Sequence, residues 1–294
     1  MSIDPAPQLA AWQAFEAALN ATGREMYYSI CPHTPAPPNG TAAAYRGNVM
    51  YAAPAVWSAA QRQATANSIL VEYMNTFDEW FSPRTYGRPE PGGLLTNIDA
   101  AVEMTQLAYS VPGSWNDLDM LEICNYGEGQ NVHAKGGMTL GEYESHYAVW
   151  AVLASPLILS SDLRVIQAKH PDCFALMTNA ELVAVNQDAA ALAPWVVKQA
   201  FNHTPVVSSS DVVAQVFARP LSGDRTAVVL FNRAEAPQVM AVTWEELRIA
   251  AGTSCAVRDV LNRSDLPDAT VQFTATVAPH GVVFVVLSPN KTLV

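Results

Sequence analysis

Pro112-Gly-Ser-Trp-Asn-Asp-Leu-Asp-Met-Leu121 is the most informative stretch of this chain. Asp117 and Asp119 stand two positions apart, so a strand running through them would point both carboxylates to the same side. Taken alone, the two residues fit either a catalytic pair or a metal site. Met120 to Ile123, which overlaps the end of the stretch, reads as a short strand.

Outward from this stretch, short apolar runs alternate with helical patterns. Helices are predicted at residues 9–21, 54–77 and 98–109, and a further helix starts at Thr139 and runs through Trp150. Thr139 and Glu142 have the spacing of a capping box at its start. Strands are predicted at residues 25–31, 42–50, 120–123 and 157–160. Alternating strands and helices of this kind indicate a parallel sheet.

The sequence pattern changes near Val196. Beyond it, short strand-like runs are separated by turn signals such as Ser222-Gly-Asp224. This pattern predicts an antiparallel β-sandwich of about a hundred residues. We therefore expect two domains, residues 1–195 and residues 196–294.

Composition narrows the range of partners. The chain has 294 residues, of which 50% are hydrophobic and 15% are charged, and its formal net charge is -11. This acidic balance argues against a nucleic-acid partner, because the chain offers no basic patch to the phosphate backbone. No apolar run reaches the roughly 20 residues of a membrane span, so no membrane partner is expected either.

The four cysteines, Cys31, Cys124, Cys173 and Cys255, are widely scattered and form no Cys-x-x-Cys pair. Their spacing indicates neither a zinc site nor a redox dithiol. Buried free thiols are the favoured interpretation, although the sequence leaves their disulfide status open. We expect no metal and no other cofactor.

The opening stretch belongs to an ordered series of motifs. Downstream of it come Gly136-Gly-Met-Thr139, Glu142-Tyr143, Ser145-His146, Ala154-Ser-Pro-Leu-Ile-Leu-Ser-Ser-Asp-Leu-Arg164 and Ala184-Val-Asn-Gln-Asp188. The sandwich region adds Arg219-Pro-Leu-Ser-Gly223, Leu230-Phe-Asn-Arg233, Val257-Arg-Asp259 and Val277-Ala-Pro-His-Gly281. In this order and spacing, the motifs resemble the second half of the barrel, and the C-terminal domain, of melibiase-type α-galactosidases (glycoside hydrolase family 27).

The resemblance implies a fold and a reaction. The expected fold is α/β plus all-β: the second half of a (β/α)8 TIM barrel, followed by an antiparallel β-sandwich. Members of the family cleave terminal α-galactosyl residues with retention, which requires two carboxyls about 5 Å apart. The family nucleophile is an aspartate in a Lys-x-Asp motif on the fourth strand, whereas the first predicted strand here matches the fifth. A whole barrel needs about 250 residues, so we expect the nucleophile half to be absent from this chain.

The resemblance also assigns roles to single positions. Met50 stands where the family has its acid/base aspartate, four residues after Arg46. Cys31 and Arg46 match sugar-contacting positions, but Pro32 replaces the glutamate that reads the sugar 2-hydroxyl. No residue of this chain is therefore assigned a catalytic role.

Other positions receive binding, supporting or structural roles. Asp117 and Asp119 match paired aspartates that the resemblance makes supporting residues near the floor of the site. Trp115 is either a sugar-stacking platform or a core tryptophan. Asp162 is expected to cap the helix that begins near Leu163. Three histidines have weaker assignments: His146 is expected to be packed, His280 to be structural, and a ligand role for His33 is a minor alternative.

The resulting prediction is an α-galactosidase-family glycoside hydrolase that has little or no activity as this chain alone. Its partner would be an α-galactoside or another carbohydrate. The alternatives are a non-catalytic sugar-binding relative, an unstable fragment from an incomplete gene model, and a partner-binding module. The family is mostly secreted or lysosomal and vacuolar, and five Asn-x-Ser/Thr sequons fit a secretory parent, but residues 1–7 do not have the features of a signal peptide.

Overall fold

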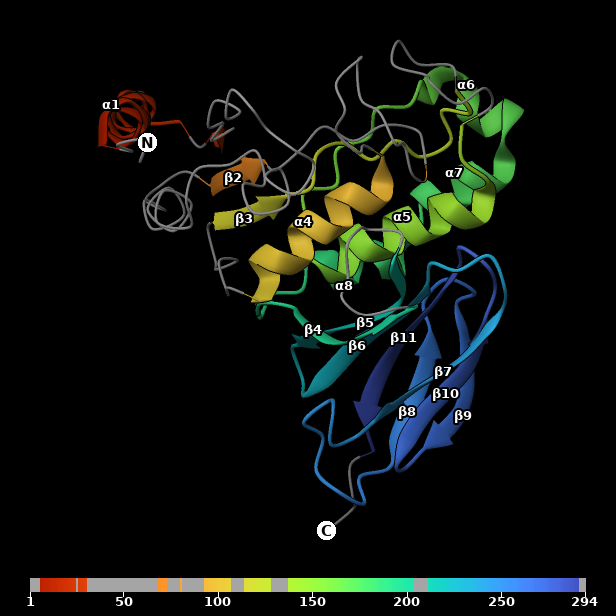
Figure 1. Cartoon of the computed structure of the whole chain (residues 1–294). Coiled ribbons are helices and arrows are strands. Elements are labelled where there is room, and N and C mark those ends of the chain that lie inside the picture. The colour runs from red at the N-terminus through yellow and green to blue at the C-terminus, as the bar shows by residue number, and fades with distance from the viewer. Residues whose placement is uncertain are drawn as a thin grey trace.

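The computed structural model describes residues 6–24, 26–30, 68–72, 80, 93–106, 114–127, 137–202 and 211–290. A mixed α/β region forms the N-terminal part and an antiparallel β domain forms the C-terminal part (Figure 1). Helix α5 (Leu140–Val152) lies between the two parts and packs on strands of the β domain.

The α/β region contains a parallel sheet. Strands β1 (Tyr27–Ile30), β2 (Ser68–Glu72) and β3 (Ser114–Asp117) pair in that order. The remaining described elements of this region are helices α1 (Ala6–Ala21), α4 (Leu94–Gln106), α6 (Leu163–Lys169), α7 (Pro171–Met177) and α8 (Ala180–Asn186). The parallel pairing agrees with the prediction from alternating strands and helices.

Two segments differ from the sequence prediction. The predicted helix 54–77 is wrong at residues 68–72, which form strand β2. The run Ser68-Ile-Leu-Val-Glu72 has only five residues, and so short an apolar run does not distinguish a strand from a buried part of a helix. The predicted strands 120–123 and 157–160 reduce to a single parallel bridge between Leu121 and Leu159. The predicted strand 42–50 lies outside the described residues.

The predicted helix starts are confirmed for α5 and α6. The Thr139 side chain accepts a hydrogen bond from the backbone N–H of Glu142, and Glu142 Oε2 accepts one from the backbone N–H of Thr139 at 2.7 Å. Asp162 accepts a hydrogen bond from the backbone N–H of Arg164 and so caps α6.

The β domain consists of two antiparallel sheets. The larger sheet has six strands in the order β4-β5-β6-β11-β8-β9, and β10 pairs with β7 in the smaller one. The strands are β4 (Trp195–Phe201), β5 (Val212–Leu221), β6 (Arg225–Asn232), β7 (Gln238–Thr243), β8 (Cys255–Asp259), β9 (Ser264–Ala269), β10 (Gln272–Val277) and β11 (Val282–Pro289).

The central strands β5, β6 and β11 of the six-stranded sheet are buried on both faces, whereas the residues of the outer strands β4 and β9 are partly buried or exposed. On β6, Val228 and Leu230 belong to the core shared with β7 and β10, whereas Val229 and Phe231 belong to the core shared with the helices. Successive side chains of a strand alternate between faces, so one apolar strand serves both cores. The α/β region therefore covers a sheet face that an isolated sandwich would expose.

Three of the sandwich motifs hold the two parts together through polar contacts. Arg219 of β5 donates hydrogen bonds to the carbonyl oxygens of Val185 and Asn186 at 2.8 and 3.0 Å, which places its positive charge at the carboxyl end of α8. Arg258 of β8 forms two hydrogen bonds with the Glu181 carboxylate, at 2.7 and 3.0 Å.

His280, in another of these motifs, also makes a polar contact between the two parts. It lies in the turn before β11, and its Nδ1 lies 2.7 Å from Oε1 of Glu142 on α5. Its ring also stacks on Trp80, with 4.5 Å between the ring centroids. This position agrees with the structural role predicted for His280.

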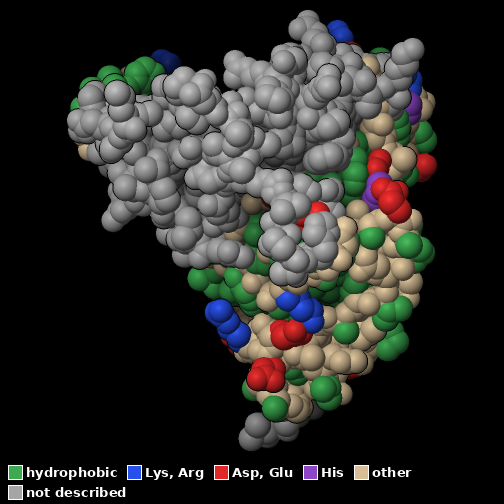
Figure 2. Space-filling view, viewed as in Figure 1, with side chains coloured by type: hydrophobic (Ala, Val, Ile, Leu, Met, Phe, Trp, Pro, Cys, Tyr) green, Lys and Arg blue, Asp and Glu red, His purple; other side chains and the backbone are tan. Residues whose placement is uncertain are grey.

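The face of the β domain that Figure 2 shows has both acidic and basic side chains. On the described part of the face in Figure 2, acidic and basic side chains are few and lie among neutral ones. The helices of the described ranges include none that is both long enough and apolar enough to cross a membrane.

Candidate functional site

The candidate site lies at the carboxyl end of β3. Asp117 is the last residue of the strand and is almost fully buried, and its Oδ1 accepts a hydrogen bond from the backbone N–H of Asp119 at 2.9 Å. Asp119 lies beyond the strand and has a φ of 69°, in the left-handed region. The expectation that a strand points both carboxylates to one side is therefore wrong, because the extended backbone ends between them.

Neighbouring side chains fix the backbone around this turn. The Nδ2 of Asn97 on α4 donates to the Leu118 carbonyl oxygen at 2.9 Å, and the Leu118 N–H donates to the Ser155 hydroxyl at 2.9 Å. Trp150 of α5 donates its indole N–H to the Asp119 carbonyl oxygen at 2.9 Å. The turn is thus held by helix α4, helix α5 and the segment after α5, so its conformation depends on tertiary contacts.

A second polar cluster is formed by residues that follow the bridge between Leu121 and Leu159. The Ser160 hydroxyl lies 2.9 Å from Glu122 Oε2, and Asn125 Nδ2 donates to Ser160 Oγ at 2.9 Å and also contacts Glu122. Sequence reasoning missed Glu122, because it interpreted Met120 to Ile123 only as a strand. A polar residue inside a short apolar run was the signal that could have singled it out.

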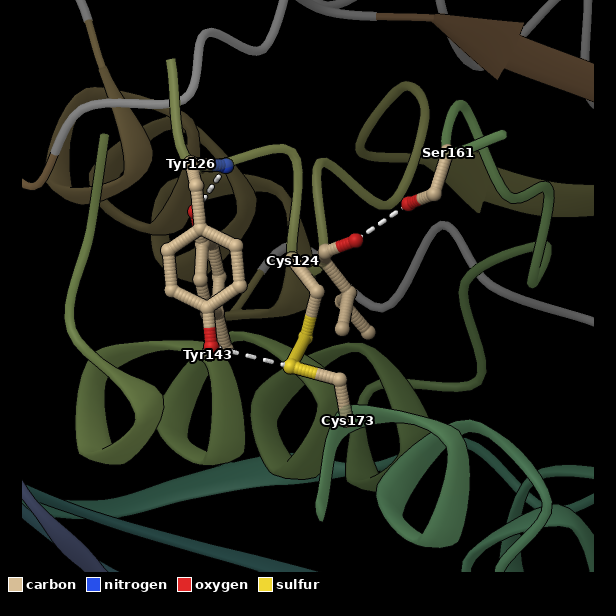
Figure 3. The surroundings of a disulfide bond; sticks show 6 residues. Cys124, Tyr126, Tyr143, Ser161 and Cys173 are labelled. Carbon is tan, nitrogen blue, oxygen red and sulfur yellow. Dashed lines mark hydrogen bonds between the residues drawn. A yellow bond between two sulfur atoms is a disulfide. The ribbon is translucent and has the colours of Figure 1, made fainter. Parts of the chain in front are cut away.

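A disulfide joins the segment after this cluster to α7. Cys124 is bonded to Cys173, 49 residues along the chain (Figure 3). The prediction of buried free thiols is therefore wrong for these two residues, while Cys255 is free and buried as expected. The spacing gave no sign of the pair, because the reversal of the chain between α5 and α7 brings the two cysteines together.

Two tyrosines lie next to the disulfide. The Tyr126 hydroxyl is 3.1 Å from Cys173 Sγ, and the Tyr126 backbone N–H donates to the Tyr143 hydroxyl at 2.9 Å. Their rings meet edge to face, with 5.3 Å between the centroids (Figure 3). The disulfide and the tyrosine pair together fix the segment that follows Glu122.

Trp115 belongs to a different environment from the paired aspartates. It lines a cavity of about 530 Å³ together with residues 154–158, which connect α5 to the bridge at Leu159. In a parallel α/β arrangement, a helix-to-strand connection lies at the amino edge of the sheet. Neither Asp117 nor Asp119 lines this cavity. The two aspartates thus lie at one turn, and Trp115 lies at a separate cavity.

His146 is buried in α5, as predicted, and has an unusual environment. It is fully buried, neither ring nitrogen has a hydrogen-bond partner among the described residues, and its ring meets Trp150 at 4.1 Å between centroids. Burial lowers the pKa of His146 to about 3, so the ring is neutral at physiological pH.

The remaining predicted site residues are not part of the described structure. Cys31, Arg46, Met50 and His33 all lie outside the described residues. Within the described ranges, no three or more His, Cys, Asp and Glu side chains gather as a metal site would require.

The α/β region with its paired aspartates, and the antiparallel two-sheet domain that follows it, each match a profile of glycoside hydrolases. The family profile described as alpha galactosidase A matches residues 94–188. The profile described as alpha galactosidase C-terminal beta sandwich domain matches residues 212–287. The chain belongs to the melibiase-type α-galactosidases, glycoside hydrolase family 27.

Individual α-galactosidases are also similar to this chain in sequence. Alpha-galactosidase 3 of Arabidopsis thaliana is 30% identical over 274 residues, which cover 93% of this chain and 50% of that protein. The α-galactosidase of Cyamopsis tetragonoloba is 30% identical over 258 residues, 87% of this chain and 54% of that protein. The chain thus spans about half the length of these curated relatives.

A solved structure aligns with nearly the whole chain. The crystal structure of α-galactosidase I from Mortierella vinacea superposes with a TM-score of 0.73 at 26% sequence identity. The superposition covers 99% of this chain and 66% of the other. The fold described above is therefore similar to about two thirds of that structure.

Proposed function

We propose that residues 1–195 form the second half of a (β/α)8 barrel of a retaining α-galactosidase-type glycoside hydrolase, and that residues 196–294 form its C-terminal sandwich. The observation that carries this proposal is the Asp117–Asp119 turn at the carboxyl end of a parallel strand. Active sites of such barrels lie at the carboxyl ends of the strands. The profile matches and the parallel pairing of β1, β2 and β3 support the same assignment.

In this proposal the two aspartates support the site and do not carry out catalysis. The Asp117 carboxylate holds the turn through the Asp119 backbone N–H, and Asp119 holds α5 through Trp150. Both interactions hold backbone in place at the strand end. They are the kind of contact through which the loops around a sugar site are positioned.

We further propose that the 294-residue polypeptide has little or no glycosidase activity by itself. No Lys-x-Asp triplet occurs anywhere in its sequence, and methionine stands at position 50. Retaining hydrolysis needs both a nucleophile and an acid/base, and general acid catalysis alone contributes about 10²–10⁴-fold. Cys31 and Arg46 would still contact the sugar in this proposal.

The test is an assay of the purified chain with aryl glycosides. We expect no hydrolysis of an aryl α-galactoside above background. Aryl α-N-acetylgalactosaminide is tested in parallel, because human alpha-N-acetylgalactosaminidase is also similar, at 28% identity over 283 residues. Turnover of either substrate that survives repurification would refute the proposed inactivity.

A calorimetric titration with galactose separates the alternatives. Binding without turnover would favour a non-catalytic sugar-binding relative of the family. If the chain aggregates under every condition, the unstable-fragment alternative is favoured.

A further inference from the structure

The cavity beside Trp115 is separate from the strand-end cluster and has its own chemistry. Its volume is about 530 Å³, within the range of small-molecule sites. Its lining comes from residues 154–158, from residues after α8, and from Arg219 of β5. The cavity therefore lies where the α/β region meets the sandwich.

Arg219 supplies a buried positive charge to this cavity. The residue is only 1% exposed. Its Nε donates to the Leu192 carbonyl oxygen at 2.9 Å, and its Nη1 donates to the carbonyl oxygens of Val185 and Asn186. The Nη2 donors meet no acceptor within the described part of the chain, and Arg219 lines the cavity.

No carboxylate in the described structure neutralises this guanidinium by direct contact. The Asp188 carboxylate also lines the cavity, but its direct bonds go to other residues: it accepts hydrogen bonds from the Ser222 backbone and hydroxyl, and it forms an ion pair with Arg225 at 3.1 Å. A buried guanidinium bonded only to neutral carbonyl oxygens favours an anion at its remaining donors, because charge-assisted bonds to a carboxylate are the stronger ones.

Part of the remaining lining is apolar, whereas Ser155, Asn186, Gln187 and Asp188 are its polar members. Trp115, Pro156, Leu157 and Ile158 present an indole ring and aliphatic surface. A ligand that satisfies both features has a carboxylate at one end and an apolar body at the other. An inorganic anion alone would leave the apolar walls unused.

We propose that this cavity binds a small organic carboxylate, with the carboxylate on the Arg219 Nη2 donors and the apolar body against Trp115 and residues 156–158. The site is separate from the proposed sugar site, because neither Asp117 nor Asp119 lines it; the two are linked only through Ser155, whose hydroxyl accepts the Leu118 N–H.

The test is calorimetric titration of the full chain with 2-naphthoate, using 2-naphthamide as the matched neutral probe. We expect 2-naphthoate to bind about tenfold more tightly than the amide, because only the carboxylate makes charge-assisted bonds. Absence of 2-naphthoate binding up to millimolar concentration, or equal affinity for the two probes, would overturn the proposal.

Substitutions in the cavity lining test whether 2-naphthoate binds in this cavity. Ala189→Trp and Ile158→Trp each place an indole at the lining without removing a bond of Arg219, and each should weaken 2-naphthoate binding about tenfold or more. Val239→Trp is the control, since Val239 is 75% exposed on β7 and does not line the cavity. Circular dichroism selects the variants that fold. Unchanged binding in a folded cavity-filling variant would contradict the assignment.

Discussion

Arg233 and Asp99 form a two-bonded ion pair that joins the sandwich to helix α4. Arg233 Nη1 lies 2.5 Å from Asp99 Oδ1, and Nη2 lies 3.2 Å from Oδ2. Nη1 also donates to Gln215 Oε1 of β5 at 3.1 Å. The Arg233 side chain is fully buried and that of Asp99 is 24% exposed. The last residue of the Leu-Phe-Asn-Arg motif thus bonds to both parts of the chain.

Replacing Arg233 by methionine should destabilise the chain. The substitution leaves Asp99 and Gln215 without this partner, and breaking a buried ion pair costs roughly 3–5 kcal/mol. The partial exposure of Asp99 places the expected loss near the lower end of that range. Denaturant unfolding of the unsubstituted chain and of the Arg233→Met variant measures this loss.

Arg164→Met is the matched control for that substitution. Arg164 also pairs with an aspartate, Asp162 at 2.7 Å, but its side chain is 87% exposed. We expect no measurable loss of stability, because exposed ion pairs are screened by solvent. An equal loss in both variants would show that burial of the Arg233 pair is not the cause.

Reduction of the Cys124–Cys173 disulfide should lower stability. The bond closes a loop of 49 residues. By lowering the conformational entropy of the unfolded chain, such a cross-link stabilises the folded state by roughly 3–4 kcal/mol. Thermal unfolding with and without dithiothreitol measures the loss. The variant Cys124→Ser/Cys173→Ser should already show the lower midpoint and should not respond to the reductant. A response of equal size in that variant would mean that the reductant acts elsewhere.

His146 should make stability depend on pH. The folded state holds this ring neutral with a pKa of about 3, whereas the unfolded chain protonates it near pH 6.5. The unfolded state therefore binds more protons between these values, and the free energy of unfolding falls as the pH is lowered from about 6.5 towards 3. The contribution of His146 is about 1.4 kcal/mol per pH unit at most.

The variant His146→Phe isolates this contribution. It keeps an aromatic ring beside Trp150 but removes the titrating group, so its stability should fall less steeply over the same pH range. Chemical denaturation at several pH values measures the two slopes. Equal slopes, or an NMR titration that places the His146 pKa above 6, would contradict the prediction.

The isolated sandwich, residues 196–294, should fold but self-associate. Its six-stranded sheet would expose the face that now packs against the helices, which includes Phe217, Phe231 and Phe284. A large exposed apolar patch promotes association. Far-ultraviolet circular dichroism and sedimentation at several concentrations provide the measurement. A folded monomer at every concentration would show that this face does not need the α/β region.

Met50→Asp alone should not restore glycosidase activity. A proton donor without a nucleophile supplies one of the two carboxyls that retaining hydrolysis requires. The measurement is hydrolysis of an aryl α-galactoside by the single variant. Restored turnover would show that another carboxylate, such as Asp117, acts as nucleophile.

The sequence by itself determined the family, the parallel and antiparallel character of the two parts, and the local helix starts. The caps at Thr139 and Asp162 involve residues three and two positions apart, so the sequence contains both partners of each hydrogen bond. The order of the motifs identified the family for a similar reason. Recognising that order does not require knowing which residues meet in space.

Tertiary structure alone decided the contacts between distant segments. The disulfide spans 49 residues, the Arg233–Asp99 pair spans 134, and the Arg219 bond to Val185 spans 34. It also decided the turn at Asp119 and the strand at Ser68–Glu72, where short patterns fit more than one conformation. These features depend on which helix or sheet face lies opposite. That choice is made by packing of the whole chain, and no local pattern contains it.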